Sequence, residues 1–164
     1  MELYENKIEQ ERAVLVSVDT GEFDVDSSLR ELTELARTAG AEVICEMTQK
    51  REAPEAGTYL GKGKLQELSD FCEAEKPDLI IIDGELSPAQ QKNIETITDV
   101  RVIDRTTLIL DIFAGRALTK EGKIQVELAQ LKYRSARLVG LRSSLSRLGG
   151  GIGTRGPGEK KLEI

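Results

Sequence analysis

One short stretch of the 164-residue chain decides its fold: Leu79-Ile80-Ile81-Ile82-Asp83. It follows Pro77, which ends a helical pattern, and it precedes Ser87-Pro88, where proline suits the first position of a new helix. A continuous apolar run between such signals is typical of a strand buried on both faces. We therefore expect a buried β-strand over residues 79–83.

Apolar runs alternate with helical patterns over the first 105 residues. Three further runs, at 13–18, 43–47 and 100–103, predict strands. Asp26 is the predicted N-cap of a helix that ends before Gly40, and further helices are expected over 64–75 and from Ser87. Four strands separated by helices predict βαβ crossovers, and hence an α/β fold with a small parallel sheet flanked by helices.

Three residues fall at or just after the predicted strand ends: Asp83, Gly84 and Asp104. Open α/β sheets bind ligands at the carboxyl ends of their strands. An aspartate that ends a strand also serves as a turn former or a helix cap. The sequence thus leaves open an alternative function, a stand-alone domain that binds a small ligand or nucleotide near Asp83 and Asp104.

A second, helical region is expected over 106–164, after an α/β subdomain over 1–105. It starts with a short helix over 107–116, whose apolar residues Leu108, Ile109, Ile112 and Phe113 are expected to face inward. One long helix is expected over 122–148. Seven of the ten residues 149–158 are Gly or Pro, which predicts an irregular loop, and 159–164 would begin a return helix.

The long helix carries an apolar stripe with a spacing of seven residues. The stripe consists of Ile124, Leu131, Leu138 and Leu145, with Leu128, Leu141 and Leu148 beside them. A stripe of this period is the seam of a helix–helix pair. Without a complete return helix, the seam over 124–148 would self-associate with another chain, bend back on the α/β body or be poorly ordered.

Composition excludes several functional classes. The chain has no His and two Cys, which rules out His-ligated metals, zinc sites and Ser-His-Asp triads. Cys45 and Cys72 lie in apolar patterns and are expected to be core thiols. No apolar run approaches the ~20 residues of a membrane span, and the N-terminus is too acidic for a signal peptide. We expect a soluble, cytoplasmic protein with no catalytic constellation and no metal site.

The net charge of −6 hides an asymmetry along the chain. Residues 1–120 hold 25 acidic and 14 basic side chains, whereas residues 121–164 hold four acidic and nine basic ones. An acidic body with a basic arm is typical of a protein that binds a polyanion at one end. A solvated helix face is the alternative interpretation of the same charges.

Glycine-rich segments resemble phosphate-binding motifs without matching them. Residues 57–63 fall one residue short of a P-loop, and the G-x-G-x-x-G at 151–156 follows a helix instead of a strand. Such glycines still expose backbone N–H groups to phosphates or bases, and arginine suits both. The RNA-binding candidates are therefore Arg134, Arg137, Arg142, Arg147, Gly151, Gly153, Thr154, Arg155 and Gly156, with a secondary basic loop of Tyr59, Lys62 and Lys64.

Five ordered segments resemble the N-terminal region of HflX-type GTPases, and the resemblance covers nearly the whole chain. They are Ala56-Gly-Thr-Tyr-Leu-Gly-Lys-Gly-Lys64, Asp83-Gly-Glu-Leu-Ser-Pro-Ala-Gln-Gln91, Val102-Ile-Asp-Arg-Thr-Thr-Leu-Ile-Leu-Asp-Ile-Phe113, Glu121-Gly-Lys-Ile-Gln-Val-Glu-Leu-Ala-Gln-Leu131 and Leu148-Gly-Gly-Gly-Ile-Gly-Thr-Arg-Gly-Pro-Gly-Glu159. The chain departs from the usual family pattern at Lys160, where the family has threonine.

The resemblance implies a GTPase that binds the large ribosomal subunit and its rRNA, and that splits or rescues stalled ribosomes. In that family an α/β subdomain precedes a two-helix hairpin, whose glycine-rich loop reaches rRNA, and a G domain follows. The chain contains no G-x-x-x-x-G-K-[ST] motif. GTP and Mg²⁺ are therefore expected in a C-terminal G domain that is absent from this chain, which itself is expected to hold no cofactor and to have no enzymatic activity.

Overall fold

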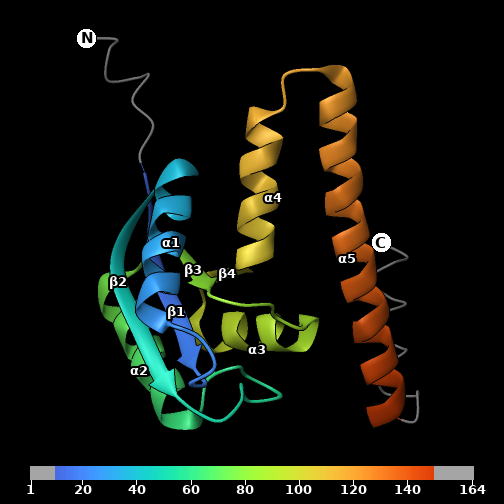
Figure 1. Cartoon of the computed structure of the whole chain (residues 1–164). Helices are drawn as coiled ribbons and strands as arrows, with labels where there is room; N and C mark the ends of the chain where they lie inside the picture. Colours follow the sequence, from blue (N-terminus) through green and yellow to red (C-terminus); the bar gives the residue numbers. More distant parts are fainter. Residues whose placement is uncertain (1–9, 150–164) are drawn as a thin grey trace.

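The computed structural model describes the backbone of residues 10–149 and the side chains of residues 10–136. Its centre is a parallel four-stranded sheet built from β1 (Glu11–Asp19), β2 (Ala41–Lys50), β3 (Leu79–Ile82) and β4 (Arg101–Asp104). The strands lie in the order β2-β1-β3-β4, so the two longest strands form one half of the sheet (Figure 1). The predicted α/β fold with a small parallel sheet is confirmed.

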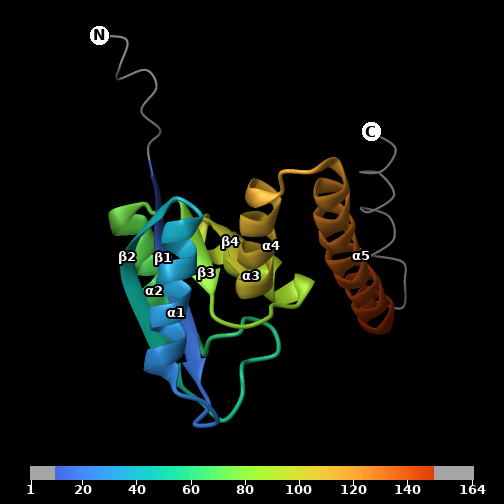
Figure 2. The same ribbon diagram turned by 45° about the horizontal axis from the view of Figure 1, so that its top comes forward.

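Five helices complete the described part of the chain: α1 (Val25–Thr38), α2 (Lys62–Glu75), α3 (Pro88–Thr98), α4 (Arg105–Arg116) and α5 (Lys120–Gly149). The first four connect or follow the strands, and α5 lies outside these layers beside α4 (Figures 1 and 2). At 1.5 Å per residue, the 30 residues of α5 extend for about 45 Å.

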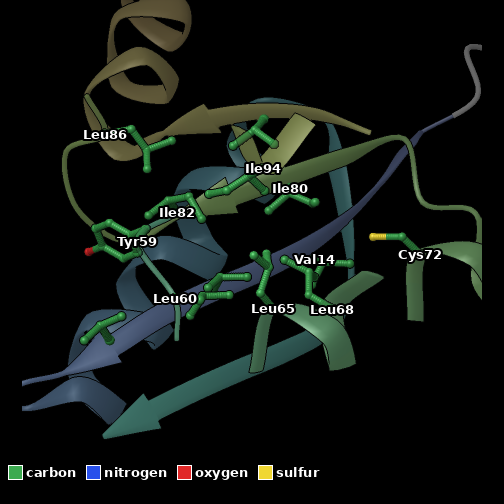
Figure 3. Close-up of a cluster of buried hydrophobic side chains, with 13 residues drawn as sticks. Val14, Tyr59, Leu60, Leu65, Leu68, Cys72, Ile80, Ile82, Leu86 and Ile94 are labelled. Carbon is green, nitrogen blue, oxygen red and sulfur yellow. The ribbon is translucent and has the colours of Figure 1, made fainter. Parts of the chain in front are cut away.

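The sheet buries apolar side chains on both faces, because successive residues of a strand point to opposite sides. On one face, Leu79 and Ile81 of β3 pack with α1 and α4. On the other face, Ile80 and Ile82 pack with α2 and α3, together with Tyr59 from the loop before α2 (Figure 3). All four residues of β3 are buried, which is why its sequence lacks the alternation of a half-exposed strand.

Capping residues explain where two of the helices begin. Ser87 accepts a hydrogen bond from the backbone N–H of Gln90, whose side chain bonds back to Ser87, and Pro88 occupies the first turn. The prediction of Asp26 as the N-cap of α1 is wrong, because Asp24 takes that role and accepts hydrogen bonds from Asp26 and Ser27 at 3.1 and 3.2 Å. An Asp-x-Asp sequence offers two caps, and local pattern alone did not separate them.

Helices α4 and α5 run antiparallel and side by side in both views (Figures 1 and 2). Leu108 and Ile112 of α4 are buried as predicted, but Phe113 is 54% exposed, so the prediction that it faces inward is wrong. The reason is that α4 has one flank on the sheet and another towards α5. Phe113 lies on neither of these flanks.

The apolar stripe of α5 faces solvent in the described residues. Ile124, Leu128 and Leu131 are 55%, 50% and 55% exposed. The half-buried residues Gln130 and Tyr133 lie on the opposite side of the helix, towards α3 and α4. Helix α5 therefore packs on the body through a mixed face, on which Val126 and Ala129 lie beside Gln130 and Tyr133. The rest of the predicted seam lies beyond the described side chains.

Candidate functional site

Asp83 joins three elements at the carboxyl edge of the sheet. Its Oδ2 accepts hydrogen bonds from the hydroxyls of Ser17 in β1, at 3.3 Å, and Ser28 in α1, at 2.7 Å. Its Oδ1 accepts one from Arg105 Nη1 at 2.9 Å, and Arg105 also pairs with Glu31 of α1. The carboxylate is buried, and each of its oxygens has a donor from the chain itself.

Asp104 forms a second junction, and it is fully buried. Its Oδ1 caps α4 by accepting from the backbone N–H of Thr107 at 3.0 Å. Its Oδ2 accepts from the backbone N–H of Leu86, just before α3, at 3.0 Å, and from the hydroxyl of Tyr133 on α5. One carboxylate thus holds the starts of α3 and α4 and the middle of α5 together, and we name this set the Asp104 junction.

Tyr59 fills the space beside these two aspartates. Its side chain is 6% exposed and its hydroxyl donates to the backbone carbonyl of Asp83 at 3.4 Å. Burial, and then the charges of Asp83 and Asp104, raise the pKa of Tyr59 to about 12. A Cβ at Gly84 would overlap the Tyr59 hydroxyl, so glycine is required for this close approach.

The carboxyl edge is therefore occupied by the protein's own side chains. Open α/β sheets bind ligands where the strand order reverses, here between β1 and β3. At this position Asp83, Ser17, Arg105 and Tyr59 already satisfy one another. The geometry favours a structural role for Asp83 and Asp104 over the alternative of a small-ligand site at the strand ends.

Residues 10–136 contain neither a cluster of potential metal ligands nor an activated cysteine. No group of three or more potential metal ligands occurs there, and no described helix is long and apolar enough to cross a membrane. Burial raises the pKa of the Cys72 thiol to about 11, and burial followed by the charge of Glu46 raises that of Cys45. Both thiols contact the core between the sheet, α2 and α3, as predicted, and neither is activated as a thiolate.

The predicted RNA-binding residues fall in three structural classes. Arg134 is exposed on α5 and borders a cleft between α3, α4 and α5. The backbones of Arg137, Arg142 and Arg147 belong to α5, although their side chains lie outside the described residues. The glycine-rich segment with Gly151, Gly153, Thr154, Arg155 and Gly156 is also outside them.

The predicted basic loop is divided between the core and the surface. Tyr59 is buried, so its ring does not face solvent, whereas Lys62 is exposed at the start of α2. Lys64 lies in the first turn of α2 and pairs with Glu67 at 3.2 Å. Of this loop, Lys62 is therefore the cation that stays most available to an external anion.

Sequence reasoning missed Arg105 and the face of α5 with Gln130 and Tyr133 that lies towards α3 and α4. It also missed Lys92 of α3, which borders the same cleft as Arg134. Nothing in the local sequence indicates that Arg105 reaches Asp83, which lies 22 residues earlier in the chain. For this face of α5 the sequence does contain a signal. Gln130 and Tyr133 are three residues apart and lie opposite the leucine stripe, which is the spacing of residues on a common helix face.

Comparison with known proteins places these features in a family. The family model described as "GTP-binding GTPase N-terminal" matches residues 26–114, and the one described as "GTP-binding GTPase Middle Region" matches 116–164. GTPase HflX of Lacrimispora saccharolytica is 62% identical over 164 residues, which cover 99% of this chain and 39% of that protein. GTPase HflX of Escherichia coli K12 is 46% identical over 153 residues, 93% of this chain and 36% of that protein.

A solved structure is similar over almost the same extent. The crystal structure of a GTP-binding protein from the hyperthermophilic archaeon Sulfolobus solfataricus in complex with GDP has a TM-score of 0.59 and 26% identity. The match covers 94% of this chain and 46% of the archaeal one. The chain thus spans less than half the length of the relatives that it matches.

Proposed function

The chain belongs to the HflX family of GTPases, and we propose that it is the ribosome-binding part of a GTP-hydrolysing protein. The partner we propose is rRNA of the large ribosomal subunit, and the process is the splitting or rescue of stalled ribosomes in the cytoplasm. The family match supports the proposal that the protein hydrolyses GTP. The resemblance of the glycine-rich and helical segments to the family's ribosome-contacting hairpin supports the proposed rRNA partner.

The observation that carries the proposal is the segregation of charge onto one end of the chain. The segment between Leu128 and Gly158 holds six Lys or Arg and no Asp or Glu, whereas the preceding body is strongly acidic. Most of this segment belongs to α5, which lies outside the layers of the α/β body (Figure 1). Phosphate-rich RNA is attracted to such an arm and repelled by the acidic body, which orients the protein on its target.

The proposed contact surface consists of the α5 arginines and the glycine-rich segment after them. Arg134, Arg137, Arg142, Arg147 and Arg155 would bind phosphates or stack on bases. Gly151, Gly153 and Gly156 would bring backbone N–H groups, together with the Thr154 hydroxyl, close to the RNA. Lys62 would add a separate phosphate contact from the α/β body.

GTP hydrolysis is proposed for the part of the protein beyond the matched regions. The two family models describe N-terminal and middle regions, and no P-loop sequence occurs between residues 1 and 164. We propose that a G domain in the part of the relatives that this chain does not span holds GTP and Mg²⁺. The 164-residue chain would then bind RNA without hydrolysing GTP.

Pelleting with purified large subunits tests the proposal, for the 164-residue chain and in parallel for the longer protein. If the chain makes about six phosphate contacts, raising the salt concentration from about 50 to about 200 mM should lower its affinity by about 10³-fold. Arg147→Ala combined with Arg155→Ala should weaken binding and lower the slope of log affinity against log salt by about two. An affinity that does not change with salt concentration would contradict the proposal.

The matched control removes two exposed cations from the acidic body, by Arg30→Ala and Lys50→Ala. These substitutions make the same change in net charge, but on α1 and at the end of β2. The proposal requires the control to bind as well as the unmodified chain. Equal losses in the two double variants would show that net charge alone, and not the α5 arm, determines binding.

A further inference from the structure

A cleft of about 530 Å³ separates α5 from the α/β body. Its walls come from three helices, with Lys92 and Glu95 on α3, Leu110 on α4, and Tyr133 and Arg134 on α5. Ligand sites in proteins commonly have volumes of about 300–1,000 Å³. This space is therefore large enough for a small ligand or for one unit of a polymer.

The cleft is preformed by hydrogen bonds among its own helices. The Asp104 junction joins the starts of α3 and α4 to Tyr133 of α5. Near it, the Gln130 side-chain amide donates to Asp111 Oδ1 at 3.3 Å and ties α5 to α4 a second time. A ligand would therefore meet walls whose positions are set before it binds, which lowers the cost of ordering them.

The walls combine an apolar surface with two cations. Pro88, Leu110 and the Tyr133 ring form flat apolar and aromatic surface. In the part of the chain whose side chains are described, Lys92 and Arg134 take part in no ion pair, although both border the cleft. A ligand with a planar ring and a negative charge would satisfy both kinds of surface.

Two carboxylates also border the cleft, and both are hydrogen-bonded within the protein. Glu95 Oε2 accepts from the backbone N–H of Val102 at 2.9 Å, and Asp111 accepts from Gln130. Their charges balance those of Lys92 and Arg134, so the cleft has no large net potential. The cleft thus offers two cations for one phosphate and no surplus of positive charge for a free polyphosphate.

We propose that this cleft binds one unpaired nucleotide of an RNA strand, with the base beside Tyr133 and Leu110 and its phosphate at Lys92 and Arg134. The inference rests on the proposed RNA-binding function and adds a specific subsite to it. The cleft lies beside the middle of α5, at Gln130, Tyr133 and Arg134, and the same helix leads into the proposed phosphate contacts at Arg137 and beyond. A volume of about 530 Å³ leaves room for one nucleotide and not for a section of duplex, so the base must be unpaired.

Photocrosslinking and binding measurements test the subsite. Short single-stranded RNAs carrying one 4-thiouridine are irradiated with the chain, and the modified peptides are mapped by mass spectrometry. The subsite predicts crosslinks to the α5 peptide with Tyr133 and to the α4 peptide with Leu110. In anisotropy titrations, Lys92→Glu should weaken RNA binding by about 10-fold, because a phosphate contact is lost and a negative charge takes its place.

Two further variants separate the subsite from general charge effects. Lys50→Glu makes the same charge change at the end of β2, outside the cleft, and should weaken binding less than 3-fold on electrostatic grounds. Leu110→Trp fills the cleft without changing charge and should abolish the crosslinks to the Tyr133 peptide. Equal effects of Lys92→Glu and Lys50→Glu, or unchanged crosslinks with Leu110→Trp, would overturn the inference.

Failure of the inference is distinguishable from failure of the proposed function. If all cleft variants still pellet with large subunits in a salt-dependent way and no crosslink maps to the cleft, the proposed function is supported and the nucleotide subsite is overturned. If the unmodified chain binds neither RNA nor large subunits, both fall. Protection of the Tyr133 peptide by free AMP, with no competition from RNA, would reassign the cleft to a small molecule and overturn the inference.

Discussion

The Asp104 junction makes the sharpest prediction about stability. Asp104 is fully buried, caps α4 and accepts hydrogen bonds from Leu86 and Tyr133. We expect Asp104→Ala to remove these three interactions at once. The substitution should loosen the starts of α3 and α4 and the attachment of α5, while the two apolar cores keep their residues.

The expected loss follows from the three contacts. Removal of an N-cap costs about 1 kcal/mol. The buried Leu86 N–H is left without a partner, which costs about 2 kcal/mol. Tyr133 is half-buried and its bond to Asp104 is exchanged for one with water when Asp104 is removed, so this bond contributes about 1 kcal/mol. The free energy of unfolding should therefore fall by about 4 kcal/mol, a large part of the usual total for a domain.

Urea unfolding followed by circular dichroism measures this loss. With an m-value of about 2 kcal/mol/M, the midpoint should fall by about 2 M. The matched control is Asp24→Ala, because Asp24 caps α1 with two hydrogen bonds but is exposed, so its loss should be about 1 kcal/mol. A double-mutant cycle with Tyr133→Phe should give a coupling of about 1 kcal/mol. Equal losses for Asp104→Ala and Asp24→Ala would refute the reasoning.

Three more predictions concern the core around Tyr59. The pKa of Tyr59 is raised from 10.0 to about 12 in the folded state, so the unfolded chain loses this proton first as the pH rises. The contribution of neutral Tyr59 to the free energy of unfolding is therefore present below about pH 10 and is lost between about pH 10 and 12. Urea unfolding at several alkaline pH values should show that the free energy of unfolding falls by about 3 kcal/mol over this range because of Tyr59. In the Tyr59→Phe variant this part of the pH dependence should be absent. Gly84→Ala should destabilise the fold in thermal unfolding by crowding the Tyr59 hydroxyl, and Tyr59→Phe in the same chain should restore part of the loss. Iodoacetamide at pH 8 should modify half-buried Cys45 before buried Cys72, read by mass spectrometry, and the reverse order would contradict the burial seen here.

Local patterns in the sequence were sufficient to predict the strands, most helices and the fold class. The run 79–82 predicts a buried strand because every residue is aliphatic, and no other local structure suits such a short apolar segment so well. Ser87-Pro88 predicts a helix start because capping depends on residues within one turn. These features depend on neighbours in the chain, so the sequence carries them directly.

Tertiary structure alone decided what the polar residues at the strand ends do. Asp83 and Asp104 looked equally suited to a ligand and to a cap, and the outcome depends on partners such as Arg105 and Tyr133, 22 and 29 residues further along. The strand order brings those partners to the same edge, and no local pattern encodes that order. The sequence by itself determined the elements and the family, whereas the occupied sheet edge and the cleft beside α5 arise only when distant segments meet.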